Sequence, residues 1–167
     1  MIRLALFASG VFAAYAPVLL AAEPTAASPP APAEKREVLS VHETVAVLDG
    51  VAFRLCRGLT TLCPKECGHS GEFATFTIKR YLKYETPGKF ADEKQPSFLI
   101  QVSDFNKKPQ GEPALLATIG KLKPGDFVRL SWRQEYVTKD GNSFPERPVT
   151  KLEPLTKEQA AELLGAK

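Results

Sequence analysis

The residues best suited to chemistry in this chain lie close together in one short segment. All three cysteines of the 167-residue sequence fall there, together with one of its two histidines: Cys56, Cys63, Cys67 and His69. Thiolates and imidazoles bind soft and borderline metal ions, and two of the thiols could instead pair and leave the third reactive. The composition of this segment therefore predicts a metal site, a disulfide or a redox-active thiol.

Zinc is the first candidate for a metal. Cys63, Cys67 and His69 would offer three donors from one tight turn, and Cys56 would supply the fourth from the end of the preceding strand. Three thiolates and one imidazole form a known tetrahedral zinc shell. The Cys-x3-Cys element with its nearby histidine also resembles the copper loops of exported cytochrome oxidase subunits and their assembly factors, which implies copper as a second candidate. The only methionine is Met1, so this chain lacks the axial methionine of such loops.

A disulfide is the alternative that export would favour. An oxidising compartment promotes pairing, and closing a short loop stabilises a fold by about 2 to 3 kcal/mol. Two of Cys56, Cys63 and Cys67 would pair, and the sequence alone leaves all three pairings open. The remaining thiol, near Lys65 and His69, could take part in redox exchange.

The N-terminal segment predicts export to a periplasmic or extracellular location. Arg3 precedes an apolar run from Leu4 to Ala22 that contains no acidic residue, which is typical of a signal peptide over residues 1–22. A membrane anchor is the competing interpretation, but Gly10 and Pro17 favour cleavage, after which we expect no membrane association. Residues 23–37 are rich in Ala and Pro and predict a disordered linker, so residues 38–167 are left as a single domain.

Alternating apolar and polar residues predict a domain built mainly from β-strands. We expect strands at 44–56, 73–84, 97–105, 127–138 and 144–152, a short helix at 113–122, and a C-terminal helix that Thr156 and Gln159 cap. Three strands, a helix and two strands is the order of the OB-fold, and the segment 122–128 resembles the junction before its fourth strand. The resemblance implies a five-stranded Greek-key barrel with the cysteine segment in its first loop.

The sheet itself offers a second candidate surface. On strand 73–84, Ala74, Phe76, Ile78 and Leu82 would share the buried face, and the opposite face would carry charge beside an aromatic ring. The candidate ligand-binding residues are Lys79, Tyr81, Lys83, Arg129 and Arg133. A solvated sheet face explains the same pattern. An oligosaccharide or a protein partner would suit such a surface, whereas the net charge of only +3 is too small for a dedicated nucleic-acid binder.

No nucleophile elbow, zinc-hydrolase motif or phosphate-binding loop is present, so we do not expect an enzyme. We expect His42 to be exposed and to have no chemical role. The sequence thus predicts an exported binding module of unknown ligand with a disulfide in the cysteine segment. The alternatives are a protein that binds zinc or copper there, or a thiol-redox protein.

Overall fold

The computed structural model describes residues 34–58 and 61–165. The predicted signal peptide and most of the predicted linker lie outside these residues, so both stay predictions. The first strand, β1 (Lys35–Arg54), begins a few residues before the predicted domain start.

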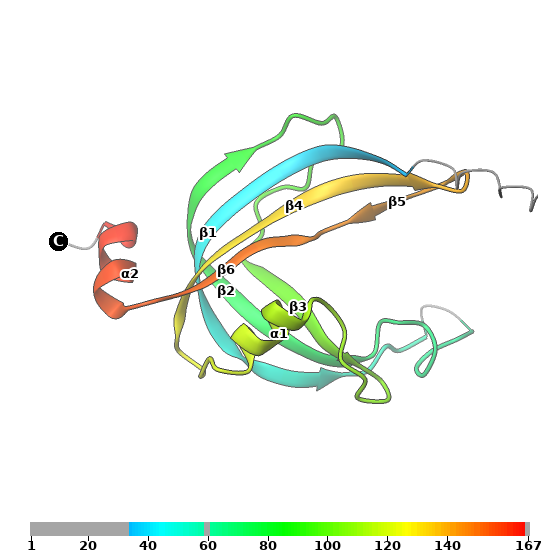
Figure 1. Cartoon of the computed structure of the whole chain (residues 1–167), viewed down its shortest axis with the longest axis horizontal. Coiled ribbons are helices and arrows are strands. Elements are labelled where there is room, and N and C mark those ends of the chain that lie inside the picture. Colours follow the sequence, from blue (N-terminus) through cyan, green and yellow to red (C-terminus); the bar gives the residue numbers. More distant parts are fainter. Residues whose placement is uncertain (1–33, 59–60, 166–167) are drawn as a thin grey trace, which may run out of the picture. The chain divides into compact units, whose positions relative to one another are not determined.

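The described chain forms one antiparallel sheet of six strands with two short helices (Figure 1). After β1 the elements follow in this order: β2 (Gly71–Glu85), β3 (Ser97–Asp104), α1 (Pro113–Ile119), β4 (Phe127–Lys139), β5 (Asn142–Glu146), β6 (Val149–Leu155) and α2 (Lys157–Leu164). The strands lie in the order β3-β2-β1-β4-β5, and β6 also pairs with β4. Long, curved β1 and β4 run side by side through the middle of the sheet. The prediction of a mainly β domain is therefore confirmed.

The predicted closed five-stranded barrel is wrong. Among the described residues β3 pairs with β2, and β6 pairs with β4, but β3 and β6 do not pair with each other. The predicted return strand is also two strands, because β5 ends at Glu146 and β6 begins at Val149. Pro148 lies in this break and has no amide hydrogen, and its carbonyl accepts from Arg133 N at 3.2 Å.

The core lies between the sheet and α1. Buried side chains from the first four strands and the helix pack into one cluster: Ala46, Leu48, Ala74, Phe76, Phe98, Ile100, Ile119, Val128, Leu130 and Trp132. Trp132 is nearly inaccessible, and its ring lies 4.4 Å from that of Phe98 between centroids. None of the described helices has the length and apolar character that a membrane crossing requires.

A bulge in β2 moves Tyr81 to the side opposite to the one predicted. Lys79 and Leu82 are extra residues in β2 at register shifts against β1, so Tyr81 packs against the core instead of sharing the solvent face. Tyr136 stays on the face that it shares with Gln134, because β4 has no extra residue in its pairing with β1, but at this end of the sheet that face is uncovered and Tyr136 is 42% exposed. A bulge reverses the faces of every later residue, and simple alternation does not detect it.

The prediction for His42 is also wrong, because its side chain is fully buried. The imidazole stacks on Trp132 with 4.5 Å between ring centroids and an 8° interplanar angle. Ser40 and Thr44, on the same strand, are buried as well. The prediction placed His42 ahead of a strand that begins at Thr44, whereas β1 begins at Lys35, so Ser40, His42 and Thr44 form a row that faces inward.

Candidate functional site

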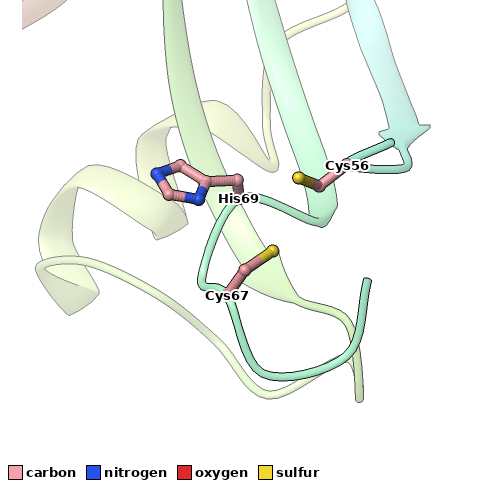
Figure 2. A group of neighbouring side chains, drawn as sticks. All are labelled: Cys56, Cys67 and His69. Atoms are coloured by element: carbon pink, nitrogen blue, oxygen red, sulfur yellow. The ribbon is translucent and has the colours of Figure 1, made fainter. Parts of the chain in front are cut away.

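The loop between β1 and β2 brings three of the four predicted donors together. The ligand atoms of Cys56, Cys67 and His69 all lie within 4.8 Å of one another. Figure 2 shows the three side chains close together where the loop leaves β1 and returns to β2. The sequence separates these residues by up to thirteen positions, so the turning of the loop produces the cluster.

Cys63, the fourth predicted donor, lies beside Cys56. The two sulfur atoms are 2.8 Å apart, well beyond the 2.05 Å of a disulfide bond. No pair of the three cysteines is at disulfide bonding distance in the described structure. The Sγ of Cys67 points to the carbonyl oxygen of Pro64, 3.8 Å away.

Hydrogen bonds at the base of the loop fix the ends that carry the donors. Cys56 N donates to Ser70 Oγ at 2.9 Å, which joins the second residue after β1 to the residue before β2. The Ser70 carbonyl in turn accepts from Gln101 Nε2 of β3 at 3.3 Å. Gly71 follows with a φ of 152°, and a Cβ there would lie 1.9 Å from the Ser103 carbonyl oxygen. Only glycine therefore allows β2 to approach β3 this closely at the start of the strand.

The donors differ in their access to solvent. Cys56 is buried, Cys67 is half-buried and His69 is exposed. Thiolates at the bottom and an imidazole at the surface would give an ion one protected side and one open side. Such an arrangement can hold a metal ion and still allow the ion to exchange with a solvent-borne donor.

The second predicted surface is divided by the fold. Lys79 and Lys83 are exposed on β2, but Tyr81 points to the other side and its hydroxyl donates to the Gln95 carbonyl at 3.0 Å. Arg129 forms an ion pair with Glu43 of β1, and Arg133 is exposed. The structure therefore does not gather these five residues on one platform.

Sequence reasoning missed a buried polar chain that begins at His42. Ser40 Oγ donates to Gln134 Oε1 at 3.3 Å and lies 2.7 Å from His42 Nε2, so Nε2 carries the hydrogen that this contact needs. Gln134 Oε1 also accepts from Asp92 N at 2.6 Å. The remaining ring nitrogen, His42 Nδ1, is buried without a hydrogen-bond partner among the described residues. The only sequence signal was the period-two row Ser40, His42 and Thr44, which resembles a solvated face.

Burial determines the protonation of His42. Desolvation disfavours the charged imidazolium and lowers the pKa of His42, and the nearby Arg147 cation acts in the same direction. The Asp92 carboxylate opposes these effects. Asp92 and Arg147 are themselves joined by two hydrogen bonds of 2.6 and 2.9 Å, which raise the pKa of Arg147. The balance of these effects favours the neutral form of His42 in the folded chain.

Comparisons of the chain with protein-family models, with curated proteins and with solved structures find no match. The candidate function therefore depends on the geometry of the chain itself.

Proposed function

We propose that the chain is an exported, non-enzymatic binding protein that holds a zinc ion in the loop between β1 and β2. The observation that carries this proposal is the mutual proximity of the ligand atoms of Cys56, Cys67 and His69, within 4.8 Å. In a tetrahedral zinc site with Zn–S bonds of about 2.3 Å, two sulfur ligands lie about 3.8 Å apart. The three donors therefore need to move by about 1 Å or less to bind one ion.

Cys63 is the fourth ligand in this proposal. Its Sγ lies 2.8 Å from Cys56 Sγ but outside the group of donors that lie within 4.8 Å of one another, so Cys63 would have to move away from Cys56 and toward the other donors to take the fourth corner. The donor set is then three thiolates and one imidazole, which suits zinc, and the thiolate majority also suits Cu(I). Zinc is the first choice because no methionine is available in the described domain.

The strand order supports a binding role for this loop. The order β3-β2-β1-β4, with β6 beside β4, resembles an OB-fold that lacks the closing pair. In that fold the loop between the first two strands borders the binding surface. We infer that an ion held here would face the partner or donor from which it is acquired.

Native mass spectrometry of the full chain, purified in reducing buffer and loaded with zinc, tests the proposal. We expect one zinc per chain, and three titratable thiols once the metal is removed. Competition with a chromophoric chelator should show that His69→Ala weakens zinc binding at least tenfold, as expected when a ligand is lost. Lys65→Ala is the matched control, because Lys65 is an exposed residue of the same loop.

A thiol-redox pair is the second candidate, and the 2.8 Å contact between Cys56 Sγ and Cys63 Sγ favours it. The same mass measurement, made on the chain purified without reductant, separates the two candidates. A metal-free mass two hydrogens below the reduced value, with one titratable thiol, would refute the zinc site and support a disulfide in this loop.

A further inference from the structure

A groove on the sheet face, away from the cysteine loop, has the features of a ligand site. Its walls are apolar side chains from β1, the segment between β2 and β3, β4 and β5: Leu39, Phe90, Tyr136 and Pro145. Glu37, Lys89 and Gln134 complete the lining, and the groove has a volume of about 470 Å³. We call these seven residues the aromatic groove. Its size falls within the range of small-molecule sites.

The aromatic groove exposes rings that a soluble domain would normally bury or omit. Phe90 is 75% exposed and Tyr136 is 42% exposed. Tyr136 pairs across the sheet with Glu37 on one side and with Pro145 on the other, so three residues of the lining are direct cross-strand neighbours. The floor is therefore a fixed sheet surface with an aromatic ring at its centre.

The segment between β2 and β3, which carries Lys89 and Phe90, is held in place by hydrogen bonds on both sides. Gly88 N donates to the Leu39 carbonyl at 3.1 Å, and a Cβ on Gly88 would lie 2.6 Å from Leu39 Cα. Tyr84 Oη donates to the Asp92 carbonyl at 2.9 Å on the other side of Phe90. Anchors before and after Phe90 fix the segment that presents its ring, so the aromatic groove is formed before a ligand arrives.

Gln134 gives the aromatic groove a directed polar group. Its side chain is buried, with 5% exposed, and its Oε1 accepts from Asp92 N and Ser40 Oγ inside the fold. These two bonds fix the orientation of the amide, and its Nε2 donates to no residue in the described part of the chain. Among the described residues, His42 Nδ1 is the only fully buried side-chain N or O atom without a partner. Gln134 Nε2 also has no partner, so it is not fully buried and is accessible at the groove that Gln134 lines.

We propose that the aromatic groove binds a neutral carbohydrate. A pyranose ring has an apolar C–H face, which suits the electron-rich faces of Phe90 and Tyr136. Its hydroxyls both accept and donate, so they match the Gln134 amide as a donor and the Glu37 carboxylate as an acceptor. Glu37 forms no ion pair with a described residue, and its charge is balanced within the groove by Lys89, whose Nζ lies 5.7 Å from the Phe90 ring centroid. This balance favours a ligand without net charge.

An extended peptide fits the aromatic groove less well. At Glu37 and Tyr136, β1 and β4 pair with each other, and β4 pairs on its other edge with β5. The floor between these strands is thus a sheet face, to which a peptide cannot add as a strand. The outer edges of β5 and of β1 before Val41 have no partner strand among the described residues, but a peptide added at either edge would extend the sheet and would not lie on its face. Polar contacts must come from side chains, which suits hydroxyl groups better than a peptide backbone.

The test is a glycan array that carries neutral and acidic oligosaccharides, probed with the full chain, with proline-rich peptides printed on the same surface. We expect binding to neutral glycans, and isothermal titration with the strongest of them should show at least a tenfold loss for Phe90→Ala and for Tyr136→Ala. Phe144→Ala is the matched control, because Phe144 is a 41% exposed aromatic residue of β5 that does not line the groove.

Near-UV circular dichroism would first establish that each variant is folded. The proposal is overturned if the wild-type chain binds no neutral glycan, if it binds only acidic glycans or the proline-rich peptides, or if the groove variants bind the selected glycan as tightly as Phe144→Ala does. The proposal does not depend on the zinc site, because the groove and the cysteine loop share no residue.

Discussion

The buried histidine should make the stability of the fold depend on pH near neutrality. In the folded chain His42 is fully buried, its pKa is lowered by desolvation, and the ring stacks on Trp132. In the unfolded chain the imidazole has a pKa of about 6.5. The unfolded state therefore binds more protons than the folded state as the pH falls below about 6.5. His42 contributes its full stability above that value and loses it progressively as the pH falls toward the lowered folded-state pKa.

The size of this effect follows from linkage. If the pH falls from about 7.5 to about 5.5, the free energy of unfolding decreases by at most about 1.4 kcal/mol, the limit for a folded imidazole that takes up no proton in this range. The maximum slope is about 1.4 kcal/mol per pH unit, which corresponds to the uptake of one proton. Nearby charges set the lower end of the pH range over which stability is lost, because Asp92 raises the folded-state pKa of His42 and Arg147 lowers it.

Urea unfolding followed by Trp132 fluorescence, at pH steps between about 7.5 and 5.5, would measure this slope. The samples need a chelator and a reductant so that neither metal binding nor thiol oxidation contributes. His42→Gln keeps a side-chain amide near the position of Nε2, within reach of Ser40, but it cannot titrate. We expect this variant to lose the slope whatever its absolute stability.

His69→Gln supplies the control, because it removes the other histidine from an exposed position, and we expect it to keep the wild-type slope. If His42→Gln shows the same pH dependence as the wild-type protein, the buried imidazole is not the source and the argument from burial fails.

Two further predictions concern the packing and the cap of the fold. Gly88→Ala places a Cβ 2.6 Å from Leu39 Cα and should lower the free energy of unfolding by about 1 to 3 kcal/mol. Gly120→Ala is the control, because its Cβ would lie no closer than 3.4 Å to a neighbouring atom and the φ of Gly120 is −64°. We expect it to change the free energy of unfolding by less than about 0.5 kcal/mol. Equal effects of the two variants in urea unfolding would refute the steric argument. Thr156→Ala removes the capping box of α2 and should cost about 1 kcal/mol by the same assay, whereas Lys157→Ala in the first turn should have almost no effect. A Thr156→Ala protein as stable as the Lys157→Ala protein would show that the cap contributes nothing.

Features that depend on neighbouring residues could be predicted from the sequence. The centres of the strands follow from alternation. The predicted capping box at Thr156 and Gln159 is confirmed, since both of its hydrogen bonds are present. It could be predicted because these bonds lie within one helical turn. The turn after β4 also lies where Asp140 and Gly141 predict it, and both residues have positive φ. The donors of the candidate metal site could be named because the cysteines and a histidine crowd into a single loop.

Features that depend on distant pairing needed the tertiary structure. A bulge in β2 reverses the face of Tyr81, and no local pattern marks the residue at which the register shifts. Tyr136 is exposed because its face of the sheet is uncovered at that end. The burial of His42 depends on Trp132 and Tyr84, which come from other strands, and on the early start of β1, which the predicted strand 44–56 did not include.

The candidate sites show the same division between local and distant information. The sequence by itself determined which side chains could bind a metal, because donor chemistry belongs to the residue type. Only the tertiary structure decided which donors meet, that the sheet is open between β3 and β6, and that an aromatic groove forms where Glu37, Phe90 and Tyr136 converge. The physical reason is that such contacts are set by strand register and loop closure, which depend on the packing of the whole domain.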